Sequence, residues 1–335
     1  MKKKNVLLTG ASGTVGFEAL KQLLDAKLYH VIVFDKKTPQ SEAKLLPFKD
    51  QVTLIFGDIT NPKDLEELAD IDAVIHLAAI IPPLADDNPE LAKRVNVSGT
   101  QHLISQLEQQ SPNAFFIYSS SISVYGDRIE NPYITVDDAL IPSAGDVYAE
   151  TKISAEQSIK SSSLDWTIFR LAAIMGNHKM SKLMFHQPLH TALEIATPRD
   201  TARAFVNAIS KQHELSKQIF NLGGGETCRM RYDEFLERSF AIFGLGKLNF
   251  PERSFADKNF HCGYYADGDK LEAIVKFRQD TLDDYFAMEA EKVSAIKKTA
   301  ASIFKRPIKW YLLQQSEPYQ AYKDNNQQLM QHYFN

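Results

Sequence analysis

Short runs of apolar and β-branched residues alternate with longer amphipathic stretches through the first half of the chain. The runs predict five strands, at residues 5–9, 30–35, 52–57, 73–77 and 114–119. Apolar residues recur at helical spacing between the first two strands and again over 96–107. Strands joined by helices in this order pair in parallel, as βαβ units. Because the strand runs are largely apolar, we expect both faces of the sheet to be covered, as in a doubly wound α/β fold.

The alternating pattern weakens after residue 170. Few turn signals occur over 178–190, a helix is predicted over 200–211, and residues 219–222 read as one more strand before three glycines. We therefore predict a sheet domain at 1–170 with a returning strand near 218–223. A smaller, substrate-binding region is expected at 171–290, and a C-terminal extension at 291–335.

The composition is that of a folded protein. The 335 residues are 44% hydrophobic and 24% charged, which excludes a disordered chain and a disulfide-stapled miniprotein. A net charge of −4 gives no overall basic field, so we expect no nucleic-acid partner.

Cys228 and Cys262 lack the spacing of a metal site. Residues 5–17 resemble a signal sequence, but three glycines interrupt the apolar run, so we expect a cytoplasmic protein without a membrane span.

A glycine-rich loop lies between the first predicted strand and the first predicted helix. Its glycines, at 10, 13 and 16, would let the backbone turn tightly and approach a pyrophosphate at the helix N-terminus. The loop consists of Gly10, Ala11, Ser12, Gly13, Thr14, Val15 and Gly16. The spacing is GxxGxxG rather than GxGxxG, and an ordinary strand-to-helix turn is the alternative.

Asp35 ends the second predicted strand, about 20 residues beyond the loop. A carboxylate there accepts hydrogen bonds from the adenosine ribose and repels a 2′-phosphate, so loop and acid together favour NAD. Lys36 and Lys37 leave NADP as the less favoured cofactor. Taken alone, Asp35 could equally be a turn residue at the end of a strand.

Tyr148 and Lys152 are four residues apart, which places them on one face of a helix. An adjacent ammonium would lower the pKa of a phenol from its usual value near 10 and make it an acid–base group. A serine-rich segment that includes Ser121 follows the fifth predicted strand, at the sheet edge where open α/β sheets bind ligands. The alternatives are an exposed helix face and a serine-rich turn.

With these motifs, residues 4–285 resemble the extended short-chain dehydrogenase/reductase superfamily, specifically its NAD-dependent epimerase/dehydratase group. The similarity also includes Gly57-Asp58-Ile59, His76-Leu77-Ala78-Ala79 and the segment from Asn96 to Thr100. It implies a Rossmann fold and a catalytic set of Ser121, Tyr148 and Lys152. It further implies a cofactor site made of Gly10, Ala11, Ser12, Gly13, Thr14, Val15, Gly16, Asp35, Lys36, Asp58, Ile59, Leu77, Ala78, Ala79, Asn96, Tyr148 and Lys152.

Two segments depart from that family's usual pattern. The family often has RPxxVYG where this chain has Arg170-Leu171-Ala172-Ala173-Ile174-Met175-Gly176. Nucleotide-sugar members also carry a longer insertion before the segment that matches residues 198–204. A complete nucleotide-diphosphate cradle is therefore not expected, and a smaller substrate or an unusual pocket fits better.

The sequence thus predicts an NAD-dependent oxidoreductase or isomerase of the epimerase/dehydratase type. It would move a hydride between nicotinamide C4 and a secondary alcohol or ketone, sugar-like or another small molecule, with Tyr148 as the acid–base group. The alternative is a non-catalytic sensor or assembly subunit that binds NAD(P) and uses its basic tail for partners.

The C-terminal extension is basic and amphipathic. Residues 292–316 hold six basic and no acidic side chains, and 292–335 carry a net charge of +5. An apolar stripe at helical spacing consists of Val293, Ile296, Ala300, Ile303 and Phe304. We expect this stripe to pack on the parent domain or on a partner copy in a homodimer. Contact with an anionic membrane surface is the less favoured alternative.

Overall fold

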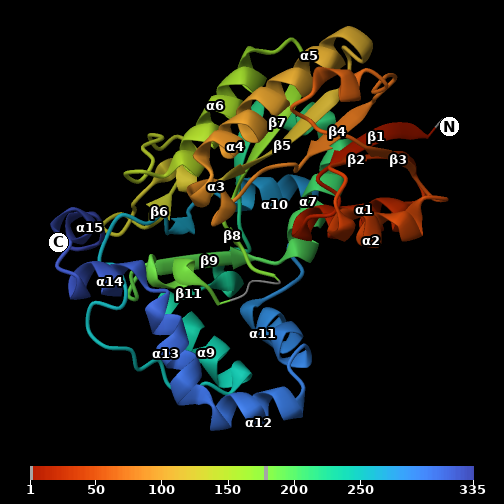
Figure 1. Cartoon of the computed structure of the whole chain (residues 1–335). Coiled ribbons are helices and arrows are strands. Elements are labelled where there is room, and N and C mark those ends of the chain that lie inside the picture. Colours follow the sequence, from red (N-terminus) through yellow and green to blue (C-terminus); the bar gives the residue numbers. More distant parts are fainter. Residues whose placement is uncertain (1–2, 177–179) are drawn as a thin grey trace.

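A computed structural model of the chain describes residues 3–176 and 180–335 (Figure 1). The expected turn-poor segment at 178–190 therefore begins outside the described residues. Seven parallel strands form the main sheet, in the order β10-β7-β5-β4-β1-β2-β3. They are β1 (Lys4–Thr9), β2 (Tyr29–Asp35), β3 (Thr53–Phe56), β4 (Ala73–His76), β5 (Phe115–Ser121), β7 (Asp165–Leu171) and β10 (Gln218–Leu222). The five predicted strands and the returning strand are all confirmed.

Helices cover both faces of this sheet. Successive residues of β1 show the two layers, because Val6 and Leu8 belong to one apolar cluster and Leu7 to the other. The first cluster receives side chains from α1 (Thr14–Ala26), α7 (Pro198–Ala208) and α10 (Asp269–Val275). The second receives them from α5 (Thr100–Gln110) and α6 (Val147–Ser161). The prediction of a doubly wound α/β fold is therefore confirmed.

A smaller lobe lies beside the carboxyl ends of the main strands (Figure 1). One sheet contains β8 (Ala173–Ile174), β9 (Ala192–Ala196) and β11 (Arg229–Arg231), and another pairs β6 (Tyr133–Ile134) with β12 (Tyr264–Tyr265). Two helices, α9 (Tyr232–Phe243) and α11 (Leu282–Glu291), pack their aromatic residues into a third apolar cluster. Four short helices lie with the main sheet instead, because Leu45 and Leu215 belong to the first apolar cluster and two of the helices contact α6: α2 (Pro39–Leu45), α3 (Leu84–Asp87), α4 (Pro89–Lys93) and α8 (Gln212–Leu215). The domain limits stay a prediction, since α7 and α10 of region 171–290 pack on the main sheet.

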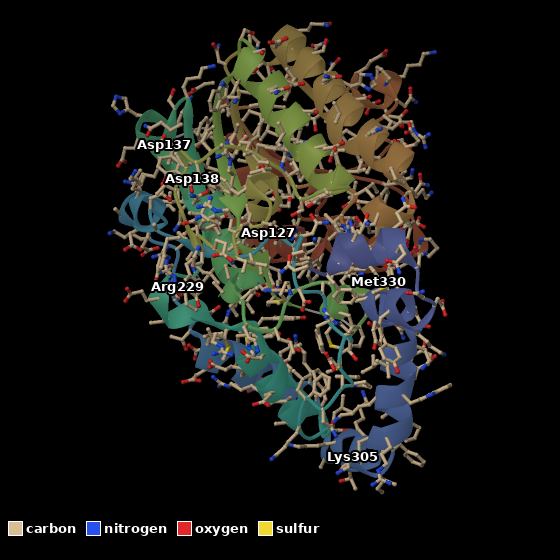
Figure 2. The ribbon with its side chains drawn as sticks, turned by 90° about the vertical axis from the view of Figure 1, so that its left-hand side faces the viewer. Asp127, Asp137, Asp138, Arg229, Lys305 and Met330 are labelled. Carbon is tan, nitrogen blue, oxygen red and sulfur yellow. The ribbon has the colours of Figure 1, made fainter. Side chains whose placement is uncertain are left out.

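The C-terminal extension forms α12 (Ala295–Ile303), α13 (Lys305–Gln314), α14 (Glu317–Lys323) and α15 (Gln327–Tyr333). The expectation that its apolar stripe packs on the parent domain is wrong for α12, whose Ile296 and Ile303 are 82% and 70% exposed. The extension packs on the parent domain through α13 instead, because Leu312 is buried in the third cluster and Ile308 packs against that cluster. Figure 2 shows Lys305 at the tip of the smaller lobe. Across the described chain, no helix is both long and apolar enough to cross a membrane.

Deleting residues 292–335 should lower the melting temperature. The deletion removes Leu312, Tyr333 and Phe334, which are nearly inaccessible to solvent, and burying one such side chain contributes about 1.5–3 kcal/mol. Thermal denaturation followed by circular dichroism measures the effect. Ile296→Ser is the matched control, because it changes an exposed residue of the same extension and should shift the unfolding free energy by at most about 0.5 kcal/mol. An unchanged melting temperature for the deletion would contradict the packing of α13.

Candidate active site

The glycine loop joins β1 to α1 and leaves no room for side chains at two positions. Gly10 has a φ of +72°, and a Cβ there would lie 2.7 Å from the backbone nitrogen of Ala78. A Cβ on Gly16 would lie 2.1 Å from the carbonyl oxygen of Gly10. Helix α1 starts at an N-cap, Gly13, without a side-chain cap and without an acidic residue in its first turn. Its first N–H groups and its positive dipole end are therefore available to an anion.

Asp35 lies at the end of β2, beside this loop. Its Oδ2 accepts a hydrogen bond of 2.7 Å from the backbone N–H of Ser12. Burial raises the pKa of Asp35, and the hydrogen bond from Ser12 and the charge of Lys44 oppose that rise. The loop and the carboxylate are thus in direct contact.

The two lysines after Asp35 are both paired with acidic residues. Lys36 Nζ is 2.9 Å from Asp58 Oδ2, and Lys37 Nζ is 3.6 Å from Glu42 Oε1. Burial raises the pKa of Asp58, but Lys36 and Thr60 outweigh it and bring the pKa to about 2. Ile59, next to Asp58, is buried in the second apolar cluster. Both lysines are therefore paired with carboxylates of the protein, and a 2′-phosphate would have to compete with these carboxylates to bind them.

A buried histidine connects the ends of β1 and β4. His76 Nδ1 lies 2.7 Å from Thr9 Oγ1, and His76 Nε2 lies 2.9 Å from Thr100 Oγ1. Burial and the charge of Lys152 lower the pKa of His76 to about 3, so the ring is neutral. Thr9 Oγ1 also accepts the N–H of Ala78 at 3.2 Å, which fixes the segment Leu77-Ala78-Ala79 against the glycine loop. Sequence reasoning matched His76 to a family segment but did not foresee this positioning role.

Asn96 joins the same segment to α6. It lies in a turn of π-helix over Arg94–Gly99, a local widening that often occurs at functional sites. Its side-chain amide accepts from the N–H of Ile80 and donates to the carbonyl of Ile80, at 2.8 and 2.9 Å. The amide also donates to Thr151 Oγ1 at 3.0 Å, within the helix that carries Tyr148. Asn96 thus fixes the distance between the predicted cofactor side and the predicted catalytic helix.

Ser121, Tyr148 and Lys152 come together at the carboxyl end of β5. Ser121 Oγ accepts hydrogen bonds from the backbone and the hydroxyl of Ser123, at 3.1 and 3.0 Å. The Ser121 side chain also lies close enough to the phenol of Tyr148 to affect its pKa. Lys152 Nζ donates to the carbonyl of Ser119 at 2.7 Å, so the ammonium is held under the end of the strand. The structure therefore brings the three predicted catalytic residues together.

The electrostatics of this group differ from the expectation. A lowered pKa was predicted for Tyr148, but burial raises it, and the hydrogen bond with Ser121 opposes the rise only in part. Burial also lowers the pKa of Lys152 to about 7, despite the nearby carboxylate of Glu156. The reason is distance and desolvation: Lys152 Nζ lies 5.6 Å from the centre of the Tyr148 ring and is bound to Ser119. The phenol is therefore protonated at neutral pH in the protein alone.

Beneath these residues lies a buried ion pair that sequence reasoning missed. Arg170 on β7 binds Glu156 on α6 through two hydrogen bonds of 3.0 and 2.8 Å, and both side chains are at most 3% exposed. Ser120 Oγ donates to Glu156 at 2.6 Å, and Arg170 donates to the hydroxyl of Tyr125 at 2.8 Å. One signal was available, because Glu156 follows Lys152 by four residues and so lies on the same face of α6.

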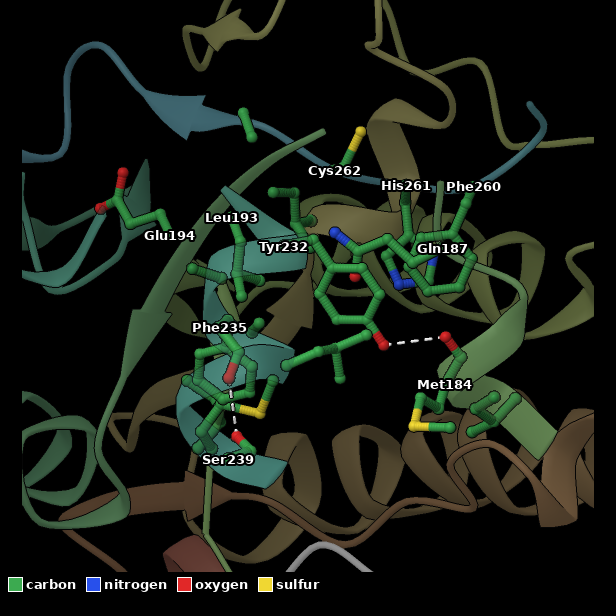
Figure 3. Close-up of a pocket in the computed structure, with 18 of the residues that line it drawn as sticks. Met184, Gln187, Leu193, Glu194, Tyr232, Phe235, Ser239, Phe260, His261 and Cys262 are labelled. Carbon is green, nitrogen blue, oxygen red and sulfur yellow. Dashed lines mark hydrogen bonds between the residues drawn. The ribbon is translucent and has the colours of Figure 1, made fainter. Parts of the chain in front are cut away.

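A cavity of about 300 Å³ is lined by Ser121 and by residues of the smaller lobe, several of which are labelled in Figure 3. Its size is at the lower end of the range for ligand pockets, about 300–1,000 Å³. Tyr148 does not line it directly but reaches it through Ser121. The walls come from segments far apart in the sequence: β8, residues 180–187, β9, α9, residues 260–263 and α11. No local pattern could have predicted this combination.

Comparisons with known proteins agree with this architecture. Residues 6–223 match the profile of the NAD dependent epimerase/dehydratase family. D-erythronate dehydrogenase of Cupriavidus necator is 25% identical over 66% of this chain and 77% of its own length. A 3 beta-hydroxysteroid dehydrogenase/Delta 5→4-isomerase of Mycobacterium tuberculosis is 30% identical over 59% of this chain, which spans only 55% of that protein. The UDP-glucuronic acid 4-epimerase of Bacillus cereus, solved with UDP-glucuronic acid and NAD, has a TM-score of 0.72 at 22% identity, covering 86% of this chain and 98% of that one.

Proposed function

Because this chain belongs to the NAD-dependent epimerase/dehydratase family, we propose that it transfers a hydride between nicotinamide C4 and a secondary alcohol or ketone, with Tyr148 as the acid–base group. One observation carries the proposal. Ser121 lines a ligand-sized cavity and lies close enough to the phenol of Tyr148 to affect its pKa, while Lys152 Nζ lies 5.6 Å from the centre of the Tyr148 ring. The relatives are named as dehydrogenases and epimerases, which favours an enzyme over a non-catalytic sensor.

The residues present fit NAD. The uncapped N-terminus of α1 would hold the pyrophosphate, Asp35 would accept hydrogen bonds from the adenosine ribose, and the segment 77–79 would lie along the cofactor. Asn96 would position the end of the cofactor site that lies next to α6, and Lys152 would contact the nicotinamide ribose. Bound there, NAD supplies the hydride acceptor, and NADH the donor.

The protein's own groups handle the proton. In the reductive direction, the Tyr148 hydroxyl donates its proton to the substrate oxygen while the Ser121 hydroxyl holds that oxygen in place. Burial raises the pKa of Tyr148, which keeps the phenol protonated and ready for this step. In the oxidative direction the phenol must first lose its proton, which the protonated form of Lys152, 5.6 Å from the centre of the Tyr148 ring, would favour.

The net reaction depends on whether the cofactor leaves between the two half-reactions. If it is reduced and reoxidised in one cycle, the enzyme is an epimerase or dehydratase; if it leaves reduced, the enzyme is a dehydrogenase. Mass spectrometry of nucleotides released from the native protein separates the two, because a tightly held NAD favours the internal cycle.

Isotope transfer tests the proposed chemistry. The enzyme is incubated with NADH that carries deuterium at nicotinamide C4 and with a panel of polyhydroxylated and hydrocarbon ketones, and the alcohols are analysed by mass spectrometry. We expect deuterium at the carbinol carbon. Ser121→Ala should mainly lower turnover, and Lys152→Met should lower both turnover and cofactor affinity. Transfer that is unchanged in both variants would place the chemistry elsewhere.

Cofactor preference is a separate prediction. The carboxylate of Asp35 should oppose a 2′-phosphate, while Lys36 and Lys37 are engaged by Asp58 and Glu42. We expect calorimetric titration to show tighter binding of NADH than of NADPH. Asp35→Asn should narrow the difference, whereas Asp50→Asn, an exposed aspartate outside the site, should not. Equal affinities in the wild type would mean that the lysines dominate.

A further inference from the structure

The cavity described above has an unusual wall for a family with nucleotide-sugar members. Among its described lining residues there is no lysine or arginine, so no cation is present to pair with a diphosphate. Most of the wall is aliphatic or aromatic. The apolar lining comprises Ile122, Ala172, Ala173, Ile174, Met175, Met180, Leu183, Met184, Leu193, Phe235, Leu236, Phe243 and Phe260.

Three polar side chains of the wall are hydrogen-bonded within the protein; Ser181 and Tyr285, which also line it, are not among them. Tyr232 donates to the carbonyl of Met184 at 2.9 Å, and Ser239 to that of Phe235 at 2.8 Å, as Figure 3 shows. Gln187 donates to Thr191 at 3.0 Å. These contacts leave few groups to bind the hydroxyls of a sugar, and replacing them would cost the hydrogen bonds they already make.

The ionisable side chains are likewise occupied. Glu194 is fully buried and paired with Arg229 at 2.8 Å, and Glu289 lies 2.5 Å from Lys292. His261 lies 3.4 Å from Asp146. Burial raises the pKa of the Cys262 thiol to about 11, so it is uncharged. Ser121 also lines this wall, and its hydroxyl is the group that the proposed function assigns to the reacting oxygen.

We propose that the substrate is a secondary alcohol or ketone with a hydrocarbon body, bound with its oxygen at Ser121 and its apolar part along the wall formed by β9 and α9. This proposal rests on the proposed function, because it uses the same Ser121 and Tyr148. Apolar surface gains most by leaving water for an apolar wall, and the three methionines can adapt to the shape of such a body.

Ligand binding tests this substrate class independently of catalysis. The enzyme bound to NAD, which cannot reduce a ketone, is titrated by calorimetry with 2-decanone and, separately, with UDP-glucose. We expect the titration with 2-decanone to show binding and the titration with UDP-glucose to show none. Leu183→Asp places a carboxylate in the wall and should weaken 2-decanone binding at least about tenfold. Leu28→Asp is the matched control, at a leucine that is 64% exposed, and should leave binding unchanged.

Phe243→Ser removes an apolar ring from the wall without adding charge and should also weaken 2-decanone binding, so the test does not depend on one variant. NADH affinity, measured in each variant, shows that the protein is folded. Tight binding of UDP-glucose without binding of 2-decanone would overturn the substrate class and leave the proposed hydride transfer intact. Binding of 2-decanone without deuterium transfer to it would support the cavity and contradict the proposed function.

A second, independent observation concerns the surface of the C-terminal extension. The apolar stripe of α12 faces solvent, and the exposed aromatic residues Phe304, Trp310 and Tyr311 continue it onto α13. Lys297, Lys298, Lys305 and Arg306 flank this surface and are all exposed. Exposed apolar groups of this size rarely remain without a partner. Two copies of this surface would repel each other through their like charges, whereas an anionic partner would be attracted.

From this charge pattern we infer that α12 and the start of α13 bind an anionic membrane surface, with Ile296, Ile303, Phe304 and Trp310 entering the interface. The arrangement has the features of an interfacial helix, with an apolar face flanked by lysines and aromatic residues. It fits the position of Lys305 at the tip of the molecule, away from the main sheet (Figure 2).

Co-sedimentation with vesicles tests this inference. The intact protein should bind vesicles of phosphatidylcholine with phosphatidylglycerol more strongly than phosphatidylcholine alone, and added salt should weaken binding. Combining Lys297→Glu, Lys298→Glu and Lys305→Glu should reduce binding at least about tenfold. Trp310→Ser should also reduce it, whereas Tyr322→Ser, a 51% exposed control on α14, should not. Absence of binding to anionic vesicles, or a dimer in sedimentation analysis that Ile296→Ser dissociates, would overturn the inference.

Discussion

Replacing Tyr148 with phenylalanine should lower turnover by at least about a hundredfold, the lower end of general acid–base contributions. The ring stays, so NAD affinity should be nearly unchanged, but the proton donor for reduction and the proton acceptor for oxidation are lost. Steady-state kinetics of the deuterium-transfer reaction measures the effect. Tyr133→Phe is the control, because Tyr133 is 63% exposed and the same atom is removed. Near-native turnover in Tyr148→Phe would refute the mechanism, whatever the fold.

The same residue determines the pH dependence. Burial raises the pKa of Tyr148 above its ordinary value near 10. Reduction needs the protonated phenol, so at pH values above the pKa of Lys152, which is about 7, its rate should stay level and then fall as the pH rises through the pKa of Tyr148. Oxidation needs the phenolate, so its rate should increase with pH over the same range. Both dependences should disappear in Tyr148→Phe.

The fold could be predicted because its signals are local. Six of the seven main strands were predicted from short apolar runs, whereas β7 was not among them. The glycines at 10 and 16 are required by close backbone contacts with each other and with Leu77 and Ala78, which follow β4. The three proposed catalytic residues could also be found from the sequence, because Tyr148 and Lys152 lie in one helix and Ser121 is the last residue of a strand. Their presence in one site follows from the parallel sheet, which gathers the carboxyl ends of its strands at one edge.

What the sequence could not give depends on three-dimensional packing. The pKa of Tyr148 was predicted to fall because a lysine is one helical turn away, but desolvation dominates once both groups are buried. The stripe of α12 has perfect helical spacing, yet spacing alone does not say whether a face meets protein or solvent. The cavity is assembled from segments with no shared pattern. The pairing of Glu156 with Arg170 likewise joins a helix to a strand and becomes visible only in the fold.

Arg170→Met should lower the free energy of unfolding by about 3–5 kcal/mol, because it leaves the buried carboxylate of Glu156 without its partner. Chemical denaturation measures the loss. Arg238→Met is the matched control, since Arg238 pairs with Asp283 at the surface, where such pairs contribute about 0–1 kcal/mol.

The double variant Arg170→Met with Glu156→Leu separates the ion pair from simple packing. It removes both charges, so it should lose less stability than Arg170→Met alone, because no unpaired charge remains in the core. Ser120 donates to Glu156 and sits directly before Ser121, so the single variant should also reduce turnover by loosening the end of β5. A single variant as stable as the control, or a double variant less stable than the single, would show that the pair is not what holds α6 against β7 beneath the site.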